Sequence, residues 1–187
     1  MKKMQKNEGF TLIELLIVVA IIGIIAAIAV PGLLRARMAG NEASAIGSLR
    51  AINSSQQAYA SSCANGFYAP LLTVLGQAPL SGGAPFISPD LSASDTVDKS
   101  GYTTTMAEGS DAANANASMP DTCSGDGADT TVSTYFATSD PVTPGGTGSR
   151  YFWTNTLGTI YFDLTLPIGF DKGNEAIPSG GTESVLQ

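Results

Sequence analysis

Glu14 is the one ionisable side chain in an apolar stretch that runs from Phe10 to Val30. A stretch of about 20 apolar residues is long enough to cross the hydrocarbon core of a membrane as a helix. A carboxylate near the middle of such a helix costs about 2.5 to 3.5 kcal/mol, and less towards a helix end. A charge in this position needs a partner, so Glu14 is the first candidate functional residue.

The run from Gly9 to Glu14, GFTLIE, closely resembles the N-terminus of type IV pilins and type II secretion pseudopilins. The resemblance extends from Lys2 to about Tyr59. It implies that a prepilin peptidase cleaves between Gly9 and Phe10 and methylates the new amine of Phe10. It also places the family's assembly acid at Glu14 and its helix-breaking proline at Pro31.

The cleaved N-terminus suggests what Glu14 pairs with. After cleavage, Glu14 lies about 6 Å along the helix axis from the amine of Phe10. A helix does not easily fold this amine back onto its own Glu14, whereas a neighbouring helix, shifted along the axis, can present its amine. We therefore expect Phe10 and Glu14 to act in assembly. The simpler alternative is that Glu14 only stabilises the first helical turn through the helix dipole.

Ordinary secretion is a second interpretation of the same segment. Lys2, Lys3 and Lys6 form a basic N-terminal region, and Ala27-Ile28-Ala29 resembles a signal-peptidase site. The apolar run is longer than the usual 7 to 15 residues of a signal peptide and contains Glu14 near its start. Both features favour prepilin processing.

The three lysines before the apolar run predict a single-pass helix with its N-terminus in the cytoplasm and the remaining chain outside. The resemblance implies an inner-membrane subunit that is surrounded by lipid before assembly and that an inner-membrane assembly platform then handles. Its further partners are copies of itself and related pilins. The product is an extracellular pilus, or a periplasmic pseudopilus in the alternative.

Cys63 and Cys123 are the only cysteines. In an exported domain an even number of cysteines favours a disulfide, here closing a loop of about 60 residues. Two free buried thiols are the alternative.

Three aspartates near Cys123, Asp121, Asp126 and Asp129, offer oxygen ligands in a glycine-rich loop. They are weak calcium candidates, because their spacing is not that of an EF-hand and acidic loops are usually just solvated. We expect no metal and no cofactor.

The composition argues against two classes of function. The chain has no histidine, the commonest general base, and no nucleotide-binding loop or nucleophile elbow, so we expect no enzyme. Removing Lys2, Lys3, Lys6 and Glu8 with the leader changes the formal net charge from −7 to −9. An acidic surface does not favour direct binding of nucleic acid.

The elements that position these residues follow from the apolar pattern. A helix is predicted from Phe10 to about Ser62, with soft points at Gly23 and Pro31. Beyond Pro31 an apolar stripe is typical of a helix packed on one face. It consists of Met38, Ala45, Leu49, Ile52 and Tyr59, while Glu42 and Gln56 are expected mostly on other faces.

Strands are predicted at 101–106, 132–137, 151–154 and 159–166, the last two forming a hairpin. In this hairpin Ile160, Phe162, Leu164 and Leu166 share the face expected to pack on the helix. Residues 107–131 are predicted to be an exposed loop, and the tail from Gly169 to be ordered only in part.

The expected fold is α+β, a long N-terminal helix packed on a small antiparallel sheet, which is also the architecture of pilins. We divide the chain into a leader (1–9), a transmembrane and assembly half-helix (10–30), an amphipathic half-helix (31–62) and an exported head (63–187). The expected function is a structural subunit of a type IV pilus. The alternatives are a type II secretion pseudopilin and a secreted or tethered binding domain that does not polymerise.

Overall fold

The structure is a computed structural model that describes residues 10–164 and 184–186. The chain divides into two compact units, Met1–Arg37 and Met38–Gln187. The predicted leader, residues 1–9, lies outside the described residues.

Helix α1 extends from Leu12 to Ser62 and contributes to both units. It begins two residues later than predicted, because Thr11 occupies the capping position before the first turn. Gly23 and Pro31 both lie inside α1, and the helix continues through them. Pro31 has no N–H to donate to the preceding turn, so this turn lacks one backbone hydrogen bond.

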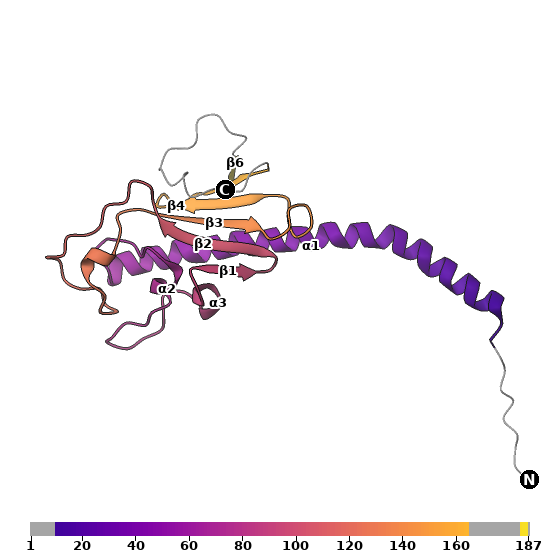
Figure 1. The fold of residues 1–187 in the computed structure, drawn as a ribbon, viewed down its shortest axis with the longest axis horizontal. Coiled ribbons are helices and arrows are strands. Elements are labelled where there is room, and N and C mark those ends of the chain that lie inside the picture. The colour runs from indigo at the N-terminus through magenta and orange to yellow at the C-terminus, as the bar shows by residue number, and fades with distance from the viewer. Residues whose placement is uncertain (1–9, 165–183, 187) are drawn as a thin grey trace, which may run out of the picture. The chain divides into compact units, whose positions relative to one another are not determined.

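The head contains one antiparallel sheet whose six strands are ordered as they occur in the sequence. Figure 1 shows the strands beside the C-terminal part of α1. The strands are β1 (Thr96–Lys99), β2 (Tyr102–Glu108), β3 (Tyr135–Pro141), β4 (Tyr151–Asn155), β5 (Ile160–Asp163) and β6 (Ser184–Leu186). Two short helices, α2 (Leu72–Leu75) and α3 (Pro89–Ser92), and a 3-10 turn, η1 (Ala128–Thr130), complete the described elements. The predicted α+β fold is confirmed.

One face of the sheet packs on α1. Leu49, Ile52 and Tyr59 of α1 are fully buried in a cluster with residues of β2 to β5, including Met106 and Phe152. The predicted stripe therefore forms the helix side of the core, with Met38 only half-buried at its edge.

The predicted hairpin is β4 and β5, which pair in antiparallel register. Ile160 lies in the core and Phe162 packs against it, as predicted. The prediction for Leu164 was wrong: β5 ends at Asp163, and Leu164 is 58% exposed. Leu166 lies outside the described residues.

The opposite face of the sheet holds a second cluster, of aromatic side chains. Trp153 and Tyr161 stack with ring centroids 4.3 Å apart, and Trp153 also contacts Phe136 at 5.7 Å. All three side chains are buried together with Tyr151.

The second predicted strand, 132–137, was placed too early in the sequence. The strand β3 begins at Tyr135, because Val132 is already paired elsewhere: its N–H donates to Tyr68 and its carbonyl accepts from Tyr68. The sequence also missed β1 and β6. The strand β6 falls in the predicted polar tail and pairs with β5.

Candidate assembly site

Glu14 lies in the first turn of α1 and is bound by Thr11. The backbone N–H and the hydroxyl of Thr11 donate to Glu14 Oε2 at 2.9 and 2.6 Å. The N–H of Glu14 in turn donates to Thr11 Oγ1 at 3.3 Å. These reciprocal bonds form a capping box, in which a threonine and a glutamate three residues later satisfy free N–H groups at a helix start.

The capping box was missed at the sequence level, although the spacing Thr11-x-x-Glu14 is its signature. It gives a concrete form to the simpler alternative, in which Glu14 stabilises the first turn. Both bonds from Thr11 reach Oε2, and no described residue donates to Oε1. The carboxylate therefore caps its own helix and still has an acceptor oxygen for a second donor.

The apolar part of α1 is uncovered. Its large side chains from Phe10 to Leu34 are 46–79% exposed, and this holds on all faces of the helix. By length and composition, α1 is long and apolar enough to cross a membrane. A Cβ built on Gly23 has no atom within 4 Å, so nothing in the described chain packs there.

The structure joins Cys63 and Cys123 in a disulfide. The bond attaches the loop segment 107–131 to the end of α1. A hydrogen bond of 3.0 Å from the Asn65 side chain to the carbonyl of Pro120 adds a second attachment. The segment contains regular structure only at the end of β2 and in η1, broadly as predicted.

The three weak calcium candidates all lie among the described residues. Among the described residues, no three aspartate, glutamate, cysteine or histidine side chains are grouped closely enough to hold a metal ion. Asp121 and Asp129 point to the surface, while Asp126 is half-buried and donates its N–H to Thr122.

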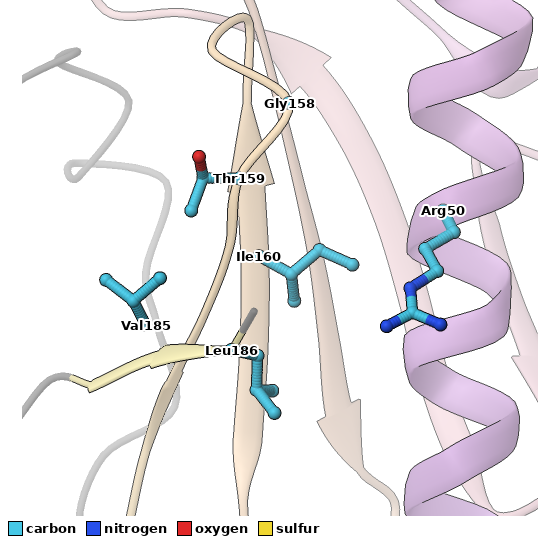
Figure 2. A pocket seen from close by; sticks show the side chains of 6 residues that line it. All are labelled: Arg50, Gly158, Thr159, Ile160, Val185 and Leu186. Carbon is cyan, nitrogen blue, oxygen red and sulfur yellow. The ribbon is translucent and has the colours of Figure 1, made fainter.

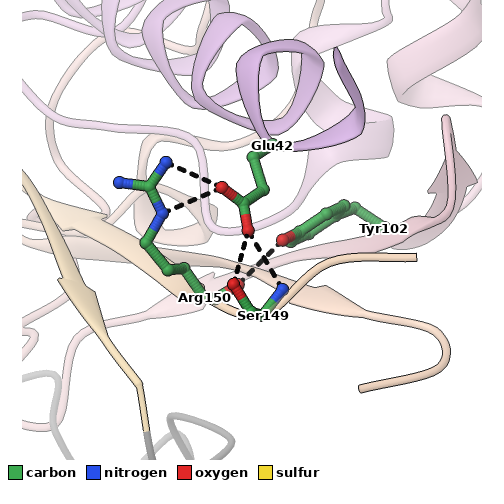
Figure 3. A network of polar contacts seen from close by, with 4 residues as sticks. All are labelled: Glu42, Tyr102, Ser149 and Arg150. Atoms are coloured by element: carbon green, nitrogen blue, oxygen red, sulfur yellow. Dashed lines mark hydrogen bonds and ion pairs between the residues drawn. The ribbon is translucent and has the colours of Figure 1, made fainter. Parts of the chain in front are cut away.

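A polar network inside the head was not expected from the sequence (Figure 3). Glu42, predicted mostly on an outer face of the helix, is buried. It accepts bonds from the N–H and hydroxyl of Ser149, both at 3.0 Å, and an ion pair of 2.7 Å from Arg150. The hydroxyl of Tyr102 donates to the Arg150 carbonyl at 2.9 Å.

The network sets the charge of its members. Burial alone would raise the pKa of Glu42, but the Ser149 N–H and the Arg150 guanidinium outweigh burial and lower it. Burial also raises the pKa of the Tyr102 phenol. Glu42 is therefore charged at neutral pH, and it fixes the loop before β4 to α1.

Gln56 was also wrongly placed on an outer face. It is fully buried, and its amide both donates to and accepts from the backbone of Ala69, at 2.7 and 2.9 Å. The two bonds satisfy a polar group that would otherwise be costly to bury.

Comparisons with known proteins agree with the N-terminal motif. Residues 4–30 match the family model of the prokaryotic N-terminal methylation motif. The type IV major pilin protein PilA of Myxococcus xanthus is 46% identical over 54 residues, covering 29% of this chain and 24% of that protein. The type IV wide pilus major component PilA4 of Thermus thermophilus is 59% identical over 39 residues, covering 21% and 30%.

A third relative comes from a secretion system. The type II secretion system core protein G of Vibrio cholerae is 39% identical over 59 residues, covering 32% of this chain and 40% of that protein. The chain thus spans less than half the length of each of these relatives. No solved structure matches it significantly. The N-terminal part of the chain thus carries the prokaryotic N-terminal methylation motif and is similar to type IV pilins and to a type II secretion core protein.

Proposed function

We propose that this protein is a structural subunit of a type IV pilus and has no catalytic role. The exposed apolar unit carries this proposal. A helix that is apolar on every face is stable only when lipid or other apolar helices cover it. Lipid covers such a helix in a single-pass membrane protein, and copies of the same helix cover it in a filament.

Glu14 guides assembly in this proposal. A neighbouring helix, shifted along the axis, presents the amine of its processed Phe10 to Glu14 Oε1, while Thr11 continues to hold Oε2. The pair neutralises both charges in an apolar surrounding, where an unpaired charge is costly. It also fixes the axial shift between the two subunits.

The remaining steps extend this role. The prepilin peptidase cuts between Gly9 and Phe10 and methylates Phe10, and an assembly platform in the inner membrane takes up the processed subunit. The chain crosses that membrane once, with its N-terminus in the cytoplasm. Gly23 and Pro31 are the positions at which α1 adjusts during assembly.

The first test is the substitution Glu14→Gln, with Glu14→Ala beside it. Both remove the charge that accepts the amine, and we expect sheared surface filaments to fall at least about tenfold while the subunit still accumulates in the membrane. Asp98→Asn, an exposed carboxylate in the head, is the charge-matched control. Filaments at wild-type level in both Glu14 variants would contradict the assembly role.

A pseudopilus is the second candidate, supported by the 39% identity to core protein G. Imaging cells with and without the protein separates the two. Loss of surface filaments indicates a pilus, whereas intact filaments with blocked protein secretion indicate a pseudopilus.

Mass spectrometry of the mature N-terminus tests the processing: methylated Phe10 supports it, and a start at Val30 indicates ordinary secretion of a non-polymerising domain.

A further inference from the structure

The sequence contains the triplet Asn-x-Ser/Thr, the acceptor signal for N-linked glycosylation, at two places. They are Asn53-Ser54-Ser55 and Asn116-Ala117-Ser118. Such triplets also arise by chance, so the sequence alone does not separate the two. The structure does, because a transferred sugar is bulky and needs an acceptor amide that is free at the surface.

The acceptor amide of the first triplet is occupied by the fold. Nδ2 of Asn53 donates to Thr154 Oγ1 and to the carbonyl of Gly158, both at 2.9 Å. Figure 2 shows Gly158, in the turn between β4 and β5, beside α1, where it lines a pocket together with Arg50 of the helix. The two bonds hold this turn against α1, so the amide of Asn53 is used within the head.

The third residue of the first triplet is occupied as well. Ser55 is 7% exposed, and its hydroxyl donates to the carbonyl of Phe86 at 2.7 Å. Residues two positions apart in a helix do not face each other, so α1 does not present Asn53 and Ser55 on one side. A transferase therefore reaches neither group of this triplet in the folded head.

The second triplet lies in a surface turn and is free. Residues 116–118 are all exposed. Oδ1 of Asn116 accepts from the N–H of Ser118, and its carbonyl accepts from the N–H of Met119, both at 2.9 Å. The first of these bonds orients the side chain through its oxygen, as in an Asx turn. Within the described parts of the chain, Nδ2 of Asn116 and the hydroxyl of Ser118 form no hydrogen bond.

The turn at Asn116 is attached to the head on both sides. Before it, the N–H of Ala115 donates to the carbonyl of Thr131 at 3.0 Å. After it, the carbonyl of Pro120 accepts from the Asn65 side chain at 3.0 Å. The free amide is therefore presented on a fixed part of the surface.

We infer that Asn116 is a site of N-linked glycosylation and that Asn53 is not. An oligosaccharyltransferase outside the cytoplasm supplies a sugar that is carried on a polyprenyl diphosphate. Nδ2 of Asn116 attacks C1 of this sugar and loses one proton. The bond between Nδ2 and C1 forms, the bond between C1 and the diphosphate oxygen breaks, and the lipid diphosphate leaves with the bonding electrons. The inference rests on the proposed export of the head.

Mass spectrometry of the full mature chain, purified from the cells that make it, tests the inference. Cleavage after lysine and arginine places the two triplets in separate peptides, 51–99 and 100–150, once the disulfide is reduced. We expect the peptide with Asn116 to carry the added mass of a glycan, which fragmentation locates at this residue. The peptide with Asn53 should carry none.

Exposed substitutions identify the acceptor signal. Asn116→Gln and Ser118→Ala should each remove the whole added mass, whereas Ser118→Thr keeps the hydroxyl and should retain it. Ser110→Ala, at an exposed serine outside the triplet, is the matched control and should also retain it. All four variants should accumulate at the wild-type level, because the altered side chains are not packed in the core. An added mass that persists in Ser118→Ala would overturn the inference.

The unreduced sample separates a missing glycan from a failure of export, since a Cys63–Cys123 disulfide forms in an oxidising compartment. An unmodified Asn116 in a chain with the disulfide overturns the glycosylation site and leaves the filament function standing. An unmodified Asn116 in a chain with two free thiols overturns the site and contradicts export of the head as well. A glycan on Asn53 overturns the inference in either case.

Discussion

The two units of the chain use one helix in opposite ways. In the first unit Leu12 and Ile28 are 79% and 77% exposed, whereas in the second Leu49 and Ile52 are 0% exposed. Apolar side chains of the same kind are therefore outside in one part of α1 and inside in the other. The head gains stability from its own packing, and the N-terminal unit must obtain it from its surroundings, lipid or other helices.

The largest expected effect concerns the disulfide, which belongs to the head alone. A loop closed over 60 residues contributes about 4 kcal/mol in the chain-entropy model. Reducing the Cys63–Cys123 disulfide in the full chain, kept in detergent, should lower the unfolding free energy of the head by about this amount. Urea unfolding, monitored by the fluorescence of Trp153, measures the change. Helicity of the N-terminal unit should persist after the head unfolds. A simultaneous loss of all helicity would contradict the independence of the two units.

A matched pair of leucines compares the units directly. Leu49→Ala leaves a cavity in the core and should destabilise the head by about 3 kcal/mol. Leu33→Ala, at a position that is 69% exposed on the same helix, should leave urea unfolding of the head unchanged. Equal effects of the two substitutions would show that the N-terminal unit shares the core of the head.

The Glu42 network gives a smaller, pH-dependent effect. Glu42→Gln leaves Arg150 without its anion, and because the Arg150 side chain is a third exposed we expect a loss of about 2 kcal/mol. The lowered pKa of Glu42 means that its contribution is present above the unfolded-state pKa and is lost as the pH falls through the folded-state value. Unfolding curves between pH 7 and pH 3 should therefore converge for wild type and variant. A constant difference across this range would rule out the charge of Glu42 as the cause.

The smallest effect is expected at the surface of the head. Lys99 and Asp90 form an ion pair of 2.6 Å, and both side chains are at least a third exposed. Lys99→Met should change the unfolding free energy by less than about 1 kcal/mol, because water and salt screen such pairs. A change as large as that of Glu42→Gln would mean that exposure does not separate the two ion pairs.

Local patterns were enough to predict α1, its packed stripe and the β4–β5 hairpin, because each depends on neighbours in the sequence. The sequence also singles out Glu14 as a candidate, since a single charge in a long apolar run is unusual, and its assembly role stays a prediction. The partner of Glu14 within its own helix was readable too, from the Thr11-x-x-Glu14 spacing, but was overlooked.

Burial of polar residues could not be predicted in the same way. Glu42 is satisfied by Ser149, 107 residues away, and Gln56 by the backbone of Ala69. Without these partners either side chain would be expected in solvent, so the helical pattern alone placed both on the wrong face. The predicted start of β3 was wrong for a similar reason, because Val132 pairs with Tyr68, which lies far from it in the sequence.

The strand order of the sheet bears on how the head folds. Each strand pairs with the one that precedes it in the sequence, from β1 to β6. A ribosome delivers α1 first and then the strands in the order in which they pair. The sheet can therefore grow against the helix one strand at a time, in the order of the sequence. The connections between β1 and β2 and between β4 and β5 are also short, which favours fast folding. For a chain with an uncovered apolar helix, a head that closes early leaves less time for the two parts to associate wrongly.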